Sequence, residues 1–202
     1  MIIDYGMGNL ASVRNALISL GGHAIISKEK KDFKTADAFI LPGVGSFGQA
    51  MENIKNARML DELNTQVLVG RKPFLGICLG MQLIAESSEE GGAHKGFGWI
   101  PGHVKRLPGS TGYRLPHVGW NNIKVKQAAP LYENIEGDTN FYFVHSYYFD
   151  CDSDYISATC EYDITFAAAV QKENIFATQF HPEKSQTNGL RLYRNFLNHI
   201  NC

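Results

Sequence analysis

Three residue types that together can perform nucleophilic catalysis occur in two short stretches of this 202-residue chain. Cys78 lies in Gly76-Ile77-Cys78-Leu79-Gly80, directly after an apolar run, and His181 and Glu183 follow about a hundred residues later. A thiolate can attack a carbonyl carbon, a histidine can carry the proton, and a carboxylate behind the histidine sets its tautomer. These types predict a cysteine nucleophile with a general base and an orienting acid.

The glycines on either side of Cys78 indicate how the nucleophile would be presented. An apolar strand that runs straight into a helix needs a sharp, strained turn, and glycines leave room beside the nucleophile, as in G-x-S-x-G elbows. Orphan N–H groups at the start of the helix would favour the thiolate and offer donors to an oxyanion. A cysteine after an apolar run is more often a small buried side chain, but two glycines and a downstream histidine favour catalysis.

His181 and Glu183 stand where a predicted strand ends. In an extended segment, residues i and i+2 point to the same side, so both side chains can face one site. Pro182 fixes φ between them and limits their relative motion. Taken alone, His181 also fits a plain strand-end histidine and Glu183 a solvated surface residue, so the prediction depends on their pairing with Cys78.

Composition narrows the functional class. The chain is 44% apolar and 22.5 kDa, which suits a single domain over residues 1–202. Its formal net charge is −1, so nothing favours nucleic acid or an anionic membrane, and a small molecule or another protein is the expected partner. Four cysteines show no zinc-site or disulfide spacing, and no targeting segment or membrane span is evident. We expect a cytoplasmic protein with reduced thiols.

Strands and helices alternate over the first part of the chain. Apolar patterns predict strands at residues 1–4, 23–27, 37–41 and before Cys78, with helices at 10–20, about 46–70 and 81–87. Such alternation predicts a parallel sheet built by right-handed crossovers. The loop Pro42–Gly45 follows a strand at its carboxyl end, where open α/β sheets place ligand-binding backbone, although Pro-Gly also marks ordinary turns.

Beyond residue 98 the pattern changes to short apolar runs separated by turn signals. They predict hairpins added to the sheet, a turn at 172–174, and a last helix at about 187–200. The predicted inward face of that helix carries Leu190, Tyr193, Phe196, Leu197 and Ile200. The expected fold class is α/β, an open, mostly parallel sheet flanked by helices with added antiparallel strands.

Six ordered motifs spread over nearly the whole chain resemble one known family. They are Asp4-Tyr5-Gly6-Met7-Gly8-Asn9, Leu41-Pro42-Gly43-Val44-Gly45, Gly76-Ile77-Cys78-Leu79-Gly80-Met81-Gln82, Pro116-His117-Val118-Gly119-Trp120-Asn121, Phe143-Val144-His145-Ser146-Tyr147 and Gln179-Phe180-His181-Pro182-Glu183-Lys184-Ser185. The chain resembles class I glutamine amidotransferases, and within them the glutaminase subunits of imidazole glycerol phosphate synthase.

The resemblance implies an activity, a partner and a set of roles. It implies hydrolysis of glutamine to glutamate and ammonia, with the ammonia passed to a (βα)₈-barrel cyclase subunit in histidine biosynthesis. It implies no metal or organic cofactor. Cys78 would be the nucleophile, His181 the acid and base, and Glu183 the residue that orients His181. Further implied residues are Leu79, Val44 and Gly45 for the oxyanion hole, Gln82, Ser146 and Tyr147 for the substrate, and Asn9, Trp120, Asn121 and Lys184 for the partner surface; a buried core position also fits Trp120.

Val44 departs from the consecutive glycines that many relatives carry in this loop. A β-branched residue resists unusual φ, and a peptide here would need to reorient to donate to the oxyanion. We therefore expect the isolated chain to be a poor glutaminase until a liganded partner reshapes the loop.

Three other interpretations remain open. A paralogue that supplies ammonia to a sugar-modifying enzyme of surface polysaccharide synthesis would carry almost the same motifs. A catalytically dead scaffold would not need Cys78, His181 and Glu183 intact. A Cys-His peptidase would leave Gln82 and the His145–Tyr147 stretch unexplained.

Overall fold

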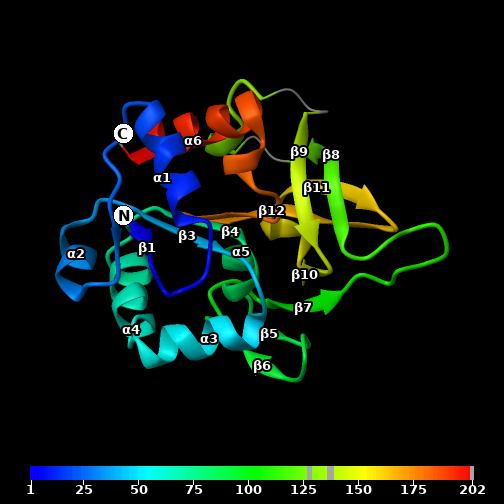
Figure 1. Ribbon diagram of the computed structural model, residues 1–202, viewed down its shortest axis with the longest axis horizontal. Coiled ribbons are helices and arrows are strands. Elements are labelled where there is room, and N and C mark those ends of the chain that lie inside the picture. Colours follow the sequence, from blue (N-terminus) through cyan, green and yellow to red (C-terminus); the bar gives the residue numbers. More distant parts are fainter. Residues whose placement is uncertain (127–128, 136–138, 201–202) are drawn as a thin grey trace.

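A computed structural model describes residues 1–126, 129–135 and 139–200 (Figure 1). Within these residues, nine strands form one sheet in the order β2-β1-β3-β4-β13-β12-β11-β8-β9, and four form a second sheet in the order β10-β7-β5-β6. The large mixed sheet with flanking helices confirms the predicted α/β class. Cys202, one of the four cysteines, lies outside the described residues.

The elements alternate first between strand and helix and then run mainly as strands. The strands are β1 (Ile2–Ile3), β2 (Ile26–Ser27), β3 (Phe39–Gly43), β4 (Phe74–Cys78), β5 (Ser87–Ser88), β6 (His94–Lys95), β7 (Gly102–Arg106), β8 (His117–Val125), β9 (Asn140–His145), β10 (Tyr147–Cys151), β11 (Ile156–Tyr162), β12 (Ile164–Lys172) and β13 (Ile175–Thr178). The α-helices are α1 (Leu10–Ser19), α2 (Lys30–Thr35), α3 (Phe47–Asn56), α4 (Leu60–Leu63), α5 (Leu79–Leu83) and α6 (Gln186–Ile200). A π-helical segment η1 (Asn64–Val69) and the 3₁₀ turns η2 (Pro130–Tyr132), η3 (Ser153–Tyr155) and η4 (Pro182–Lys184) complete them.

The parallel half of the large sheet brings three functional segments to one edge. Strands β3, β4 and β13 are adjacent and parallel, with Gly43 opposite Cys78 and Thr178 opposite Ile77. The carboxyl ends of parallel strands meet at the same edge of a sheet. The loop after β3, the cysteine that ends β4 and the histidine segment after β13 therefore lie side by side.

Alternation along the strands sorts the core into two layers. Ile40, Leu75 and Phe176 pack in one cluster, while their strand neighbours Phe39 and Phe74 pack in the other. Figure 1 shows α1 and α6 on one side of β1, β3 and β4, with α3 and α4 on the other. Because both faces are covered, the central strands are apolar throughout.

The elbow at Cys78 depends on two close approaches of backbone. Cys78 has φ 55° and ψ −107°, a rare conformation for a residue with a side chain. A Cβ on Gly76 would lie 2.6 Å from the Gly80 carbonyl oxygen, and one on Gly80 would overlap the Leu41 carbonyl oxygen. The glycines let α5 start directly against β3 and β4, as the sequence pattern predicted.

The long helix predicted for residues 46–70 is wrong as a single element. Phe47, Ala50 and Ile54 are buried on α3, but the next inward residue is Met59 rather than the exposed Arg58. A continuous helix would turn position 58 inward. Arg58 has φ 52°, so it interrupts the helix and adds one residue to the spacing between buried positions. The segments α4 and η1 then run in a new direction.

Other predicted boundaries also differ. The second strand is only Ile26–Ser27, and α5 ends at Leu83 instead of continuing to residue 87. Residues 99–100, the first of the short apolar runs predicted to form hairpins, are a bend and not a strand. The expectation that all later hairpins join the main sheet is wrong, because β7 and β10 pair in the second sheet with β5 and β6. Helix α2, with only Phe33 buried, was not predicted.

The last part of the chain agrees more closely with the sequence pattern. Strands β12 and β13 pair antiparallel around the predicted turn, with Lys172 opposite Ile175. Helix α6 begins one residue before the predicted start and buries Leu192, Tyr193 and Phe196. Leu190, predicted to face inward, is exposed, because the buried face of α6 is displaced by one residue from the predicted face.

Replacing Gly80 by alanine should disrupt the elbow. The added Cβ would overlap the Leu41 carbonyl oxygen, so we expect a loss of unfolding free energy of about 1–3 kcal/mol or more, measured by urea denaturation. Gly91→Asn is the control, because Gly91 has φ +68°, which asparagine tolerates, and no atom lies within 4 Å of the place that its Cβ would take. Equal stability of the two variants would contradict this account.

Candidate active site

The Cys78 sulfur lies at the floor of a cavity of about 410 Å³. Cys78 is 7% exposed, and its Sγ is 3.7 Å from Nε2 of Gln179 and 3.9 Å from the Val144 carbonyl oxygen. The Gln179 amide donates to the sulfur. Cys78 is therefore buried, contacted from β9 and from the residue that follows β13, and lines one cavity.

His181 and Glu183 form a buried pair beside the cysteine. His181 Nδ1 lies 2.7 Å from Glu183 Oε1, and both side chains are 2% exposed. Since the carboxylate accepts, Nδ1 carries a proton and Nε2 is left for the cysteine side. Nε2 is buried and, among the described residues, has no hydrogen-bond partner within normal limits. Such contacts in an unliganded site commonly tighten when substrate binds.

The charges around His181 favour its protonated form. Burial lowers the pKa of His181, but the negative charge of the Cys78 thiolate and the carboxylate of Glu183 outweigh it, so the pKa is raised above its usual value. The site is thus suited to a thiolate–imidazolium pair. An imidazolium can give its proton to a departing amine.

The residues predicted for the oxyanion hole border the same cavity. Leu79 is the first residue of α5, so its N–H has no partner within the helix. Val44 is 44% exposed, and Gly45 has φ +100°. A Cβ on Gly45 would come within 2.7 Å of Met7 Cε, which shows that the first loop of the chain packs against this one.

The predicted substrate residues meet at a branched hydrogen-bond network. Nε2 of Gln82 donates to the Tyr147 carbonyl oxygen at 3.0 Å and to Oε1 of Gln179 at 3.0 Å. Ser146 and Tyr147 line the cavity at the point where the chain passes from β9 in the large sheet to β10 in the small one. Both hydrogens of the Gln82 amide are used, which leaves its Oε1 for a ligand.

Glu90 is a candidate site residue that sequence reasoning missed. It follows β5 and lines the cavity, and its Oε2 accepts the N–H of Phe47 at 2.7 Å. In the sequence it stands beside Glu89 before two glycines, which indicates only a helix break. The cavity lining is Val44, Gly45, Cys78, Leu79, Gln82, Glu90, Pro116, Val144, His145, Ser146, Tyr147, His181 and Lys184.

Comparison with known proteins agrees with this geometry. The family model for class-I glutamine amidotransferases matches residues 1–200. The chain belongs to this family. Imidazole glycerol phosphate synthase subunit HisH 2 of Vibrio vulnificus (strain YJ016) is 49% identical over 201 residues, 99% of this chain and 94% of that protein. Subunit HisH 1 of Campylobacter jejuni (strain RM1221) is 47% identical over 196 residues, 97% and 98% of the two chains.

Solved structures support the same fold. A crystal structure of a glutamine amidotransferase matches with a TM-score of 0.77 and 22% identity, covering 100% of this chain and 99% of that one. At this identity the likeness concerns the fold alone.

Of the residues predicted to face a partner, Lys184 lines the cavity of this amidotransferase and the others do not. Trp120 is 44% exposed, which excludes the buried-core alternative, and its ring lies 6.2 Å from that of Tyr142. Lys184 Nζ lies 5.5 Å from the Tyr142 ring centre. Asn9 is half-buried before α1. Asn121 follows Trp120 on β8, so its side chain points to the opposite face, where it donates to the Glu161 carbonyl oxygen.

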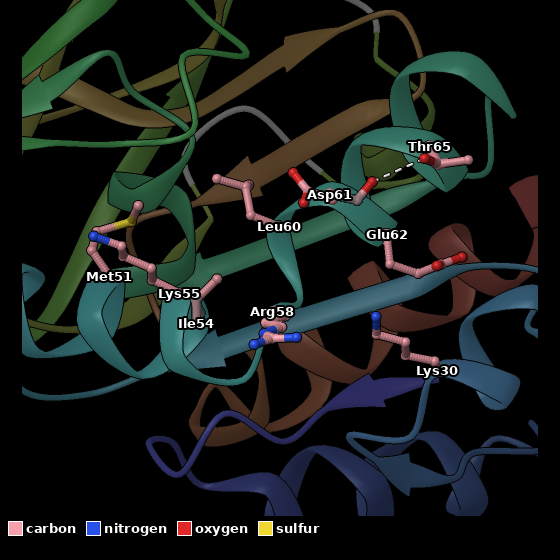
Figure 2. Close-up of a pocket in the computed structure, with 9 residues that line it drawn as sticks. All are labelled: Lys30, Met51, Ile54, Lys55, Arg58, Leu60, Asp61, Glu62 and Thr65. Carbon is pink, nitrogen blue, oxygen red and sulfur yellow. Dashed lines mark hydrogen bonds between the residues drawn. The ribbon is translucent and has the colours of Figure 1, made fainter.

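A second hollow of this amidotransferase lies between α2, α3 and α4 and measures about 340 Å³ (Figure 2). Its lining combines basic, acidic and apolar side chains but no cysteine or histidine. They are Lys30, Met51, Ile54, Lys55, Arg58, Leu60, Asp61, Glu62 and Thr65. The residues that were predicted to act on glutamine line the other cavity, at Cys78.

Two further structural tests concern metals and membranes. In the part of the chain that the structure describes, no three His, Cys, Asp or Glu side chains gather in a way that could hold a metal ion. No helix in residues 1–126, 129–135 or 139–200 has the length and apolar character to cross a bilayer.

Two buried histidines of the amidotransferase lie behind Tyr147. His145 Nε2 and His117 Nδ1 are 2.9 Å apart, and both residues are buried. Burial lowers the pKa of His117 to about 4. Burial, together with the nearby His117 and His181, lowers the pKa of His145 to about 3, against the opposing effect of the Tyr147 carbonyl. Both imidazoles are neutral near pH 7.

These shifts predict a pH-dependent stability. Unfolded imidazoles bind a proton near pH 6.5, whereas the folded ones stay neutral to about pH 4 and 3. The unfolded state therefore binds more protons below pH 6.5, so the free energy of unfolding falls as the pH drops from 6.5 toward 4. Each histidine adds up to about 1.4 kcal/mol per pH unit to this slope.

Urea unfolding at pH 7, 6 and 5 measures the effect. His117→Asn should flatten the slope relative to the unmodified chain. His23→Asn, at an exposed turn, is the control and should leave it unchanged. If the unfolding free energy of the unmodified chain and that of H117N change equally with pH, His117 binds its proton equally well in the folded and unfolded states, and the prediction is wrong.

Proposed function

We propose that this chain is the glutaminase subunit of imidazole glycerol phosphate synthase. It hydrolyses glutamine to glutamate and ammonia and passes the ammonia to a (βα)₈-barrel cyclase subunit in histidine biosynthesis. The observation that carries the proposal is the meeting of Cys78, His181 and Glu183 at one sheet edge, under a cavity of amino-acid size. Close relatives named as subunits of that synthase support the pathway. The whole chain acts as one amidotransferase domain over residues 1–202.

Polar groups in the cavity suit the main-chain end of glutamine. The Glu90 carboxylate and the unused Oε1 of Gln82 can accept hydrogen bonds from an α-ammonium group. Ser146 and Tyr147 line the cavity, and their N–H groups are the donors that we propose for the α-carboxylate. With these ends held, the side-chain amide of glutamine reaches the sulfur of Cys78.

The reaction then runs in two balanced halves. The Cys78 thiolate attacks the amide carbon, and the oxygen that becomes negative is held by N–H groups of Leu79 and the Val44–Gly45 segment. The C–N bond breaks as His181 gives its proton to the leaving nitrogen, which releases ammonia and leaves a glutamyl thioester. His181 next takes a proton from water, the hydroxide attacks the thioester, and the C–S bond breaks to give glutamate.

The partner surface lies beside the cavity mouth. Trp120 is a large exposed aromatic, and Lys184 both lines the cavity and sits over Tyr142. Exposed aromatic residues with a neighbouring cation are common anchors of protein interfaces. We place the barrel subunit here, so that ammonia released at Cys78 enters the partner without crossing bulk water.

The cytoplasm is the compartment that suits this chemistry. Cys78, Cys151 and Cys160 are free thiols in the described part of the chain. The mechanism needs Cys78 as a thiolate, and reduced thiols persist in a reducing compartment.

The central prediction concerns glutamine turnover in the assembled enzyme. The chain co-purified with its barrel subunit should release glutamate from glutamine, and Cys78→Ala should reduce the rate by at least about 10³-fold because no thioester can form. Release is measured by coupled glutamate oxidation. Cys151→Ala, a thiol outside the cavity, is the control.

Two results would count against the proposal. Turnover that survives Cys78→Ala would remove Cys78 as nucleophile, and absence of turnover in the assembled wild type would indicate a scaffold. Complementation of a histidine auxotroph that lacks its glutaminase subunit separates the histidine pathway from the polysaccharide paralogue. Failure of complementation despite full expression would favour the paralogue.

The loop at Val44 generates a further prediction about the isolated chain. Val44 is β-branched and does not adopt positive φ here, so the peptide that should face the oxyanion is costly to reorient. We expect slow hydrolysis without the partner and about a tenfold faster unassisted rate in Val44→Gly, equivalent to about 1–2 kcal/mol of backbone cost.

A matched valine-to-glycine exchange separates this effect from general loosening. Val69, at the end of η1, is 80% exposed and lies outside the cavity, so Val69→Gly should leave the unassisted rate unchanged. Brisk hydrolysis by the unmodified isolated chain, equal to that of the complex, would be incompatible with a loop that needs its partner.

A further inference from the structure

A chain of hydrogen bonds runs from β8 to the substrate end of the cavity. Asn121 Nδ2 lies 3.4 Å from His117 Nε2, His117 Nδ1 lies 2.9 Å from His145 Nε2, and His145 Nδ1 lies 2.8 Å from the Tyr147 carbonyl oxygen. The same carbonyl accepts from Gln82 at 3.0 Å. One oxygen therefore joins the two histidines to a residue of the substrate site.

Hydrogen-bond chemistry places every proton in this chain. A carbonyl oxygen only accepts, so Nδ1 of His145 carries its proton. His145 is neutral because burial lowers its pKa, so its Nε2 is an acceptor. The donor to it is then His117 Nδ1, and the remaining nitrogen of neutral His117 accepts from Asn121. Both histidines are held in the Nδ1–H tautomer.

Packing holds the two rings in place. His117 stacks on Tyr162 at 3.9 Å and 20° and on Phe143 at 5.0 Å and 25°. The ring of His145 lies 5.0 Å from that of Phe166. A sandwiched imidazole cannot turn to exchange its two nitrogens, so the direction of donation is fixed toward Tyr147.

The network continues from Tyr147 to the nucleophile. Gln82 donates to Tyr147 and to Gln179, and Gln179 donates to the Cys78 sulfur. Both amide hydrogens of Gln82 are used, whereas no hydrogen bond among the described residues uses its Oε1, and Gln82 lines the cavity. A flip of the amide would break two hydrogen bonds, and it would turn a donor toward the substrate's ammonium group.

We propose that His117 and His145 are positioning residues for glutamine, whose one-way donor chain fixes the Tyr147 carbonyl and thereby holds Gln82 with its Oε1 turned into the cavity. This inference rests on the proposed glutaminase function. Neither histidine transfers a proton in the reaction, and neither takes the place of His181. Their effect is on the recognition of the α-amino end of the substrate.

Two substitutions at His117 separate proton donation from packing. His117→Phe keeps an aromatic ring between Tyr162 and Phe143 but removes the donor to His145. His117→Asn loses the ring but places an amide N–H near the position of Nδ1. In the complex with the barrel subunit, H117F should raise KM for glutamine about tenfold with kcat changed less than about threefold, and H117N should restore KM to within about threefold.

A packing role predicts the opposite pattern, with H117F unaffected and H117N impaired, and that result would overturn the proposal. Tyr162→Phe is the control for the stack itself. It keeps the ring over His117 and loses only the hydroxyl that bonds the backbone of Arg114, so KM should not change. A raised KM for glutamine in Y162F would show that the change in KM comes from the loop before β8, which the Tyr162 hydroxyl binds. That result would count against the proposal.

The histidine tautomers provide a readout that does not depend on activity. ¹⁵N spectra of the unmodified chain should show His117 and His145 protonated on Nδ1, and a proton on Nε2 of His145 would overturn the proposal even if H117F fails to fold. Failure of the proposed function is distinguishable, since it would appear as no glutamate release by the wild-type complex. An active wild type with an unchanged KM in H117F would sink this inference alone.

Discussion

Cys78 keeps a backbone conformation that is costly for any residue with a side chain, and the packing around it supplies the compensation. The strand β4 is held on both sides by parallel neighbours, and α5 begins against β3 with no space for a side chain at Gly80. This constraint lifts the sulfur out of the sheet toward the cavity. The adjacent strands then deliver the loop at Val44 on one side and His181 on the other.

The same cavity holds histidines with opposite electrostatic surroundings. His181 is buried against the Glu183 carboxylate and the Cys78 sulfur, so its protonated form is favoured despite burial. His145 is buried against a carbonyl oxygen and another imidazole, so its neutral form is favoured. This separation of protonation states by environment is consistent with the proposed acid–base role of His181 and the proposed hydrogen-bonding role of His145.

The second sheet gives the cavity its other wall. Chain segments leave the large sheet after β9 and enter the small one at β10, and Ser146 and Tyr147 lie at this crossing. Glu90 reaches the same cavity from the turn after β5 and also binds the first N–H of α3. The proposed substrate site therefore lies between the sheets, whereas the sulfur proposed to react comes from the large sheet. Lys184 lines the same cavity from the turn η4, and Trp120 is exposed on β8 of the large sheet.

Local patterns in the sequence were enough for the elbow, the alternating first half and the last hairpin, because glycine placement and side-chain periodicity act over a few residues. His181 and Glu183 do meet, but not along an extended strand as predicted, because β13 ends at Thr178 and Glu183 lies in the 3₁₀ turn η4. Tertiary structure alone decided the break at Arg58, where the buried face had to change direction, and the separate pairing of β7 with β10. It also decided which distant polar groups meet, such as Gln82 with Gln179 and His117 with His145. Strand order and register set those contacts between residues far apart in the chain, and no local periodicity encodes them.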